Sequence, residues 1–359
     1  MISIKDVAKL ANVSISTVSN VINNTKYVSD ELKSKVNLAI NELGYEVNPI
    51  AHNMKNKQTK TIGIITANMC GILYPYIIRA IDEVLSNFGY SVIIFDSHNN
   101  GDVFETIENE KKGFKKLIAN KVDGIIFTSA IPENLENVYF ENIKNMISSS
   151  NKRIELVSIM RDFTKYNITS VFTDNFAASV VPVEHLFEIG CKNIGHITGP
   201  TYSKDVSDKL EAFKTVVKAH GYPYNETTMV AFGDFSHQSG YLCVKALLEA
   251  NPSLDGIFVA NDQMAVGVFK ALSDLKKKAP QDIKIIGYDN SFLSSILEPS
   301  LSTIDIHSVT IGQEAAKALL KNINNNDSKP PQAIKVDHTL VARKSTMAID
   351  NNDWMSVDW

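Results

Sequence analysis

From residue 60 onward, short apolar runs alternate with longer stretches in which apolar positions recur every three or four residues. Such short runs indicate buried strands and the longer stretches indicate amphipathic helices, so the pattern predicts parallel sheets covered by helices. We expect strands near 61–66, 91–95, 123–128 and 154–159 in a first lobe, and near 193–198, 228–232, 255–260 and 283–287 in a second. The main helices are expected near 75–88, 103–120, 205–220, 237–250 and 262–274.

A repeated sequence pattern supports two lobes built on one plan. The segment TIGIIT at 61–66 resembles NIGHIT at 193–198, and VDGIIF at 122–127 resembles LDGIFV at 254–259. In each half the two segments begin 61 residues apart. Equal spacing of similar segments is the mark of an internal duplication.

The order of the segments also predicts how the chain passes between the lobes. Stretches near 168–173 and 301–306 are expected to cross, and a helix from His307 to about Ile323 is expected to pack back on the first lobe. The first lobe would then hold about 60–165 and 305–325, and the second about 168–302 and 328–347.

The first residues follow a different pattern, with two short helical stretches and a tight turn between Ser3 and Asn23. Ser3 and Asp6 have the spacing of a capping box, Asn12 suits a left-handed turn position, and Ser14 can cap the second helix. We expect the side chains of Val18, Val21 and Ile22 to point inward and those of Ile15, Ser16, Thr17 and Asn20 outward. A small, hydrogen-bonding outer face suits insertion into the major groove of DNA.

Two further segments extend this headpiece. A third helix is expected from Ser29, a good cap, to Gly44, which suits the position past a helix end. The run from Asn48 and Pro49 to Lys55 predicts a helix of about two turns, too short to be stable alone in water. We therefore expect it to be a hinge that folds on DNA.

The distribution of charge fits a DNA-binding end. The chain of 359 residues carries a formal net charge of −4, but residues 1–60 carry +3 and the remainder −7. A basic head on an acidic body confines the attraction for phosphates to one end of the molecule.

These motifs resemble those of the lac repressor family of bacterial transcription regulators. The matching runs are IKDVAKLANVSISTVSNVIN and VSDELKSKVNLAINELGYEVNPIAHNMKNKQTKTIGII. The resemblance implies that the second helix reads bases and that Met54 is an apolar wedge between base pairs. The expected DNA-contacting residues are Ser14, Ile15, Ser16, Thr17, Ser19, Asn20, Asn48 and Met54. The family usually has Arg at the position of Asn20 and Leu at that of Met54. Since Asn reads adenine and Arg prefers guanine, we expect the operator to differ from the common family consensus at the base that Asn20 reads.

The same resemblance implies that the body is a periplasmic-binding-protein-like sensor with an effector between its lobes. Ligands of open α/β sheets bind beyond the carboxyl ends of the strands, and Asn261 and Asp289 each follow an expected strand there. The expected effector-binding residues, several of them family contact positions, are Tyr74, Asp96, Phe172, Lys209, Phe235, Asn261 and Asp289. Helix capping is the alternative role of Asn261 and Asp289, a loop cap is that of Asp96, and a place in the core is that of Phe235.

Two departures from the family pattern bear on the effector. The family often has Asp-Arg at the end of the fourth strand, where this chain reads Met160-Arg161-Asp162, and Lys209 stands where many relatives have Arg. Lys does not make the bidentate contact that Arg makes. A sugar is the leading effector class, and a sugar acid, a nucleoside or a phosphorylated metabolite stays open.

The sequence gives no sign of an enzyme, a cofactor or a metal. It has no Walker loop, no His-x-x-x-His and no Gly-x-Ser-x-Gly, and Ile62-Gly63-Ile64 lacks the Gly-x-Gly-x-x-Gly turn of a Rossmann dehydrogenase. Cys70, Cys191 and Cys243 are far apart, without metal-ligand spacing.

Together these patterns predict an all-α helix-turn-helix headpiece at 1–47, a hinge helix and linker at 48–59, a two-lobed α/β domain at 60–349 and a tail at 350–359. We expect a cytoplasmic homodimer that represses carbohydrate-metabolism genes. It would bind near-palindromic operator DNA and a sugar-like effector, and no membrane. The alternative is a solute-binding protein that delivers a sugar to a transporter; the headpiece and the lack of an export signal at MISIKDVAKL argue against it.

Overall fold

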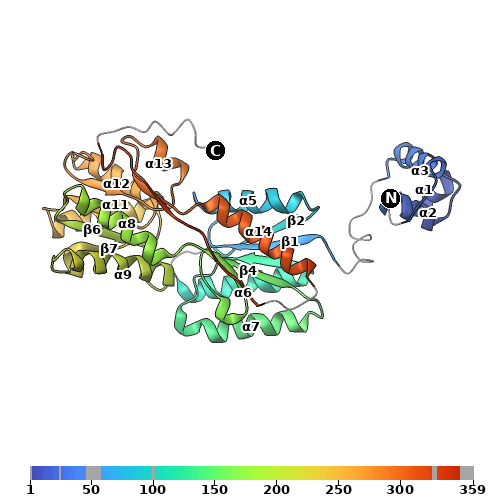
Figure 1. The fold of residues 1–359 in the computed structure, drawn as a ribbon, viewed down its shortest axis with the longest axis horizontal. Helices are drawn as coiled ribbons and strands as arrows, with labels where there is room; N and C mark the ends of the chain where they lie inside the picture. Colours follow the sequence, from blue (N-terminus) through green and yellow to red (C-terminus); the bar gives the residue numbers. More distant parts are fainter. Residues whose placement is uncertain (1, 24–25, 46–57, 99–101, 326–329, 348–359) are drawn as a thin grey trace. The chain divides into compact units, whose positions relative to one another are not determined.

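The computed structural model describes residues 2–23, 26–45, 58–98, 102–325 and 330–347. The chain divides into two compact units, with the boundary between residues 59 and 60 (Figure 1). The predicted hinge, with Asn48 and Met54, and the predicted tail at 350–359 lie outside the described residues.

The N-terminal unit consists of the three predicted helices, which are α1 (Ile4–Leu10), α2 (Ile15–Asn23) and α3 (Asp30–Leu43). They pack around buried Val7, Val18 and Val36. The carboxylate of Asp6 accepts hydrogen bonds from the backbone N–H (2.9 Å) and the hydroxyl (2.7 Å) of Ser3. These bonds join the N-cap residue to the first turn of α1, as expected. Asn12 (φ 50°) occupies the left-handed position of the turn.

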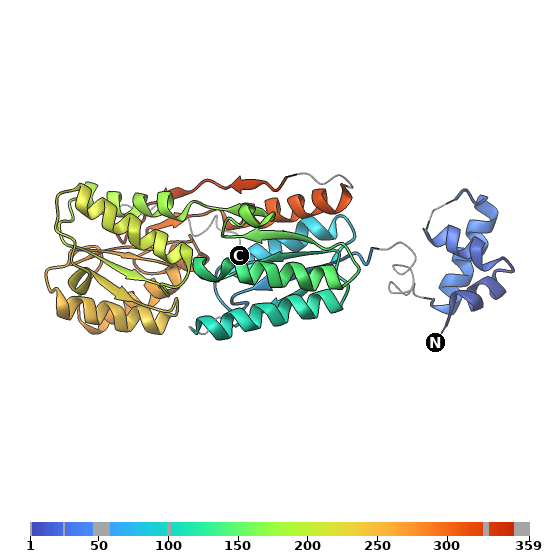
Figure 2. The ribbon, with the colours of Figure 1, turned by 90° about the horizontal axis from the view of Figure 1, so that it is seen from below.

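The first lobe of the second unit is a six-stranded sheet in the order β11-β5-β4-β3-β1-β2, in which every pair is parallel. Its strands are β1 (Thr61–Thr66), β2 (Ser91–Asp96), β3 (Gly124–Phe127), β4 (Glu155–Ile159), β5 (Thr169–Phe172) and β11 (Ala333–Lys335). One face is covered by α5 (Tyr74–Ser86) and α14 (Ser308–Asn324), and the other by α6 (Val103–Ala119) and α7 (Glu136–Ser149), as Figures 1 and 2 show.

The second lobe repeats this plan with a four-stranded parallel sheet in the order β7-β6-β8-β9. Its strands are β6 (Ile194–Thr198), β7 (Val230–Phe232), β8 (Gly256–Val259) and β9 (Lys284–Ile286). The two faces are covered by α8 (Asn175–Glu188) with α9 (Lys204–Ala219), and by α11 (His237–Ala250) with α12 (Asp262–Asp274). The short helices α10 (Glu226–Met229) and α13 (Phe292–Ile296) lie in connections.

The predicted boundary between the lobes is wrong at two strands. β5 and β11, expected in the second lobe, pair with each other and extend the sheet of the first, with Ser170 opposite Ala333 and Phe172 opposite Lys335. The chain therefore crosses after β5, after β10 (Thr303–Asp305) and between β11 and β12 (Thr339–Val341). Figure 2 shows the red segment with β11 and β12 running past both lobes. The return of α14 to the first lobe is confirmed by its packing on α5.

Close packing of α11 on α12 depends on two glycines. A Cβ added to Gly267 would lie 1.8 Å from the carbonyl oxygen of His237, and one added to Gly240 would lie 2.1 Å from that of Met264. Both obstacles are backbone atoms, so neither side chain could be accommodated without moving a helix.

We expect Gly267→Ala to lower the free energy of unfolding of the two-lobed unit by about 1–3 kcal/mol or more, because overpacking forces backbone shifts. Urea unfolding followed by circular dichroism measures the change. Gly71→Ala is the matched control, since its Cβ would meet nothing closer than 3.4 Å. Equal stabilities of the two variants would contradict the packing argument.

Candidate effector cavity and DNA-reading helix

A cavity of about 570 Å³ lies between the two lobes, beyond the carboxyl ends of their strands. Residues that follow β1, β3 and β4 line it from the first lobe, and residues that follow β6, β7, β8 and β9 line it from the second. Five of the seven predicted effector-binding residues line this cavity: Tyr74, Lys209, Phe235, Asn261 and Asp289.

Asp289 brings a buried carboxylate to the cavity. The residue is 6% exposed and has a positive φ of 105°, held by a hydrogen bond from its backbone N–H to the carbonyl of Ile304 (2.9 Å). Burial raises the pKa of this carboxyl, and the nearby ammonium of Lys209 opposes the rise. Among the described residues no donor forms a hydrogen bond to its side chain, so both oxygens are available to a ligand.

Lys209 lines the cavity, but its ammonium is already engaged. The residue is 5% exposed, and its Nζ donates to the carbonyl oxygen of Ala260 (2.9 Å) and lies 3.4 Å from the centre of the Tyr288 ring. Burial lowers the pKa of this ammonium, and the carboxylates of Asp289 and Asp205 favour the charged form. Lys209 therefore acts as an internal counter-ion of the cavity's acids.

Asn261 and Phe235 form an adjoining wall. The side-chain oxygen of Asn261 accepts from the backbone N–H of Met264 (2.8 Å), and its amide donates to the carbonyl of Phe235 (3.3 Å). Asn261 is thus the cap of α12 and also lines the cavity, and its contact with an effector stays a prediction. Phe235 has a positive φ of 69°, and its ring lies against Gly199, where an added Cβ would come within 2.4 Å of it.

The first-lobe wall contains Tyr74 and Arg161. The hydroxyl of Tyr74 lies 3.5 Å from that of Thr128. The guanidinium of Arg161 is used inside the lobe: it donates to the carbonyls of Ser129 (3.1 Å) and Ile131 (2.6 Å) and pairs with Glu136 (2.8 Å). The arginine of this reversed Arg-Asp pair therefore stabilises the first-lobe wall through contacts within the lobe.

The structure does not bring the other two predicted residues to the cavity. The carboxylate of Asp96 accepts from the backbone N–H groups of Met69 (2.9 Å) and His98 (3.0 Å), which caps the loop after β2. Phe172 ends β5 and lies opposite Lys335 of β11.

Several cavity residues were missed by the sequence reasoning. They are Asn68, Gly71, Tyr202, Asp205, Asp234, Gln238 and Gln263, among others. Asn68 and Asp234 follow β1 and β7, so the strand-end rule applied to every strand would have found them. By contrast, Asp262 is fully buried beside the cavity, where its carboxylate accepts from the Ser291 N–H (2.7 Å) and the Thr303 hydroxyl (2.7 Å), and burial raises its pKa to about 6.

In the N-terminal unit, α2 has the predicted inner face, with Val21 and Ile22 packed against the core beside Val18, and the predicted outer face is exposed at Ile15 and Ser16. The hydroxyl of Ser14 accepts from the backbone N–H of Thr17 (3.0 Å) and caps the helix. Val18 is fully buried, whereas Ser14, Ile15 and Ser16 are exposed. Thr17, Ser19 and Asn20 are half-buried. The first turn of α2 thus presents short polar side chains around one isoleucine.

Comparison with known sequences settles what this combination is. Residues 3–48 match the family described as bacterial regulatory proteins, lacI family, and residues 183–346 match the periplasmic binding protein-like domain. The ribose operon repressor of Halalkalibacterium halodurans is 32% identical over 355 residues, 98% of this chain and 99% of the relative. The chain belongs to the LacI family.

Other relatives agree with this assignment. The transcriptional repressor PurR of Edwardsiella ictaluri is 32% identical over 347 residues, 96% of this chain and 97% of the relative. The crystal structure of the lac repressor dimer bound to operator and the anti-inducer ONPF has a TM-score of 0.83 at 26% identity and covers 96% of this chain and 99% of its own. This LacI-family protein is therefore a DNA-binding transcriptional repressor that responds to an effector, and it is not an enzyme.

The family assignment confirms the predicted fold class, a helical headpiece followed by two α/β lobes. Within the described residues, no helix is both long enough and apolar enough to cross a membrane.

Proposed function

We propose that this LacI-family repressor acts as a homodimer on a near-palindromic operator, and that its effector is a neutral carbohydrate held in the cavity between the lobes. The observation that carries the carbohydrate assignment is the imbalance between free acceptors and engaged donors in the cavity wall. The carboxylate of Asp289 has no donor among the described residues, whereas the cationic groups of Lys209 and Arg161 are occupied by carbonyls, a ring and a carboxylate.

Such a wall suits a ligand that donates hydrogen bonds. Sugar hydroxyls can donate to Asp289 and Asn261, and a site built for hydroxyls rejects molecules that lack them. The ring of Phe235 offers an apolar surface beside these groups, which suits the C–H face of a sugar. A carboxylate or phosphate on the ligand would face Asp205, Asp234 and Asp289. Among the described residues, the cations that line the cavity are Lys209 and Arg161, and both are already engaged.

The mechanism is linkage between two binding equilibria. An effector moves the equilibrium between open and closed lobes only by its differential affinity for the two states. We infer that lobe closure changes how the first lobes of two subunits meet, and through them whether the headpieces fit both operator half-sites. The relative named for a ribose operon and the lac repressor dimer on its operator support this assignment by similarity.

The test is a thermal-shift screen of the full chain with matched ligand pairs. We expect at least one neutral pentose or hexose to raise Tm, because a ligand at 100 times its Kd stabilises the folded state by about 2.7 kcal/mol. The charged partner of that sugar, its 5- or 6-phosphate or its aldonic acid, is expected to give no shift at the same concentration. A larger shift with the charged partner would contradict the neutral-sugar assignment.

A further inference from the structure

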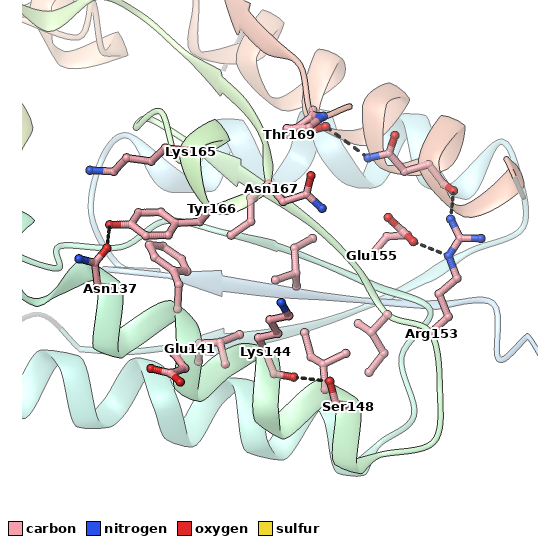
Figure 3. Close-up of a pocket in the computed structure, with 18 of the residues that line it drawn as sticks. Asn137, Glu141, Lys144, Ser148, Arg153, Glu155, Lys165, Tyr166, Asn167 and Thr169 are labelled. Carbon is pink, nitrogen blue, oxygen red and sulfur yellow. Dashed lines mark hydrogen bonds and ion pairs between the residues drawn. The ribbon is translucent and has the colours of Figure 1, made fainter. Parts of the chain in front are cut away.

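A second cavity, of about 820 Å³, opens on the first lobe between α7, β4, the short 3-10 helix η2 (Thr164–Tyr166) and the end of α14 (Figure 3). None of its lining residues lines the effector cavity. We call it the lateral pocket. Its floor is apolar and includes Phe140, Ile147 and Leu156, with the ring of Tyr166 stacked on Phe140 at 4.5 Å.

Among the described residues, two of the cations around this floor are ion-paired, whereas Lys144 and Glu141 are not. Arg153 pairs with Glu155 (2.6 Å), and Lys165 pairs with Glu136 (2.7 Å). Lys144 reaches from α7 into the lateral pocket, as Figure 3 shows, and forms no ion pair with any described residue. Glu141 stands at the edge of the pocket. An apolar floor under a free ammonium is suited to a small organic anion with an apolar body.

Glu136 connects the lateral pocket to the effector cavity. This carboxylate is 2% exposed; on the pocket side it accepts from Lys165 (2.7 Å) and from the Tyr166 hydroxyl (3.1 Å). On the other side it accepts from Arg161 (2.8 Å), which lines the effector cavity. The buried carboxylate of Glu136 thus pairs with Lys165 of the lateral pocket and with Arg161 of the effector cavity.

The arginine in turn holds the first-lobe wall of the effector cavity. Arg161 donates to the carbonyls of Ser129 and Ile131, and the backbone N–H between them, that of Ala130, donates to buried Glu110 (3.0 Å). Ala130 itself lines the effector cavity. Because a buried charge that loses a partner is costly, we expect a change at Lys165 or Tyr166 to alter the Glu136–Arg161 pair and with it this wall.

We propose that the lateral pocket binds a small organic carboxylate, with its apolar body on the floor formed by Phe140 and Tyr166 and its charge at Lys144. Its binding acts on the effector cavity through Glu136 and Arg161. By linkage, an effector in turn changes the affinity of the lateral pocket by the same factor. The site would let a second metabolite tune the response of the repressor. The proposal does not depend on the effector being a sugar.

Binding is tested with the full chain by saturation-transfer NMR, with benzoate, phenylacetate and hexanoate as probes and their uncharged amides as controls. We expect at least one carboxylate to bind saturably and its amide to bind more weakly. Lys144→Met should lower the affinity for the carboxylate about three- to fivefold, which is the contribution of a partly exposed ion pair. The affinity for the amide should stay unchanged. Lys115→Met, an exposed lysine of α6 outside the pocket, is the matched control. No saturable binding, or equal losses from both variants, overturns the proposal.

Coupling is tested by hydrogen exchange of the amides at 129–131, which needs no knowledge of the effector. We expect the bound carboxylate to change their exchange in the natural protein. Glu136→Gln should abolish that change while the probe still binds. Lys165→Met breaks the same path at a side chain that is 59% exposed, so its effect does not depend on how Glu136→Gln folds. If the probe changes the exchange of these amides in both variants as much as in the natural protein, the connection through Glu136 is overturned.

Discussion

The Asp289→Ala variant is expected to bind operator as tightly as the natural protein in the absence of effector and to lose the response to effector. The carboxylate lines the cavity and forms no hydrogen bond with the described residues, so its removal breaks no hydrogen bond of the ligand-free lobes. Hydrogen bonds to a charged group are worth about 1.5–3 kcal/mol, which corresponds to an affinity loss of roughly 10- to 150-fold. Such a loss moves the effector response out of its working concentration range.

The measurement is an operator titration of the variant with and without the sugar that the thermal-shift screen identifies. Asp96→Ala is the matched control, because this strand-end carboxylate caps its own loop and does not line the cavity. It should keep the effector response. If Asp289→Ala bound operator poorly under both conditions, Asp289 would be a residue that holds the fold, and its assignment to the effector site would be wrong.

The contrast between Asp289 and Asp96 shows how far the sequence determines the site. Both follow a strand, and the rule that ligands bind at strand ends predicts a cavity residue in each case. What separates them is the loop that follows. The two residues after Asp96 fold so that the His98 amide reaches its carboxylate, whereas the backbone N–H of Asp289 bonds to Ile304 and leaves its side chain facing the cavity. Loop geometry of this kind has no signal in residue periodicity.

The fold was predicted best where a pattern is long and local. α12 was expected at 262–274 and is found there, because its apolar residues recur at helical spacing and Asn261 caps its first turn. The lobe that holds β5 and β11 was not predicted correctly. Each is a strand of three or four residues, and its membership of a sheet depends on backbone pairing across more than 160 residues, as between Ser170 and Ala333. Short strands carry too little sequence to choose between two similar sheets.

The internal use of Arg161 also follows from contacts that are distant in sequence. When the sequence is read alone, Met160-Arg161-Asp162 is only a departure from the Asp-Arg order that the family often has at the end of the fourth strand. In the structure the guanidinium of Arg161 is satisfied by two carbonyls and by Glu136, a carboxylate 25 residues earlier. Buried arginine and glutamate are retained only when they are paired, so each explains the burial of the other. Because Arg161 is engaged in this pair, Asp289 and Asn261 are left as the candidate ligand-binding groups of the cavity.

The second large effect is expected at the DNA-reading helix. Asn20→Ala should weaken binding to the operator and leave binding to random DNA nearly unchanged, because base contacts carry sequence information and phosphate contacts do not. One bidentate contact between an asparagine and a base is worth about 1–3 kcal/mol of discrimination, roughly 5- to 150-fold. Ser16→Ala, an exposed position in the first turn of α2, is expected to change binding in the same direction by less.

Lys9→Ala is the comparison that separates base reading from general attraction. This exposed lysine in the last turn of α1 is expected to contribute to phosphate binding, so its loss should weaken operator and random DNA alike. It should also reduce the slope of log K against log salt by about 0.9, the value for one phosphate contact. Asn20→Ala should leave that slope unchanged, because an uncharged side chain releases no counterion. The two variants thus differ in two independent readouts, specificity and salt dependence. If Asn20→Ala weakened both DNAs equally while circular dichroism showed the headpiece folded, α2 would contact DNA without reading the base assigned to Asn20.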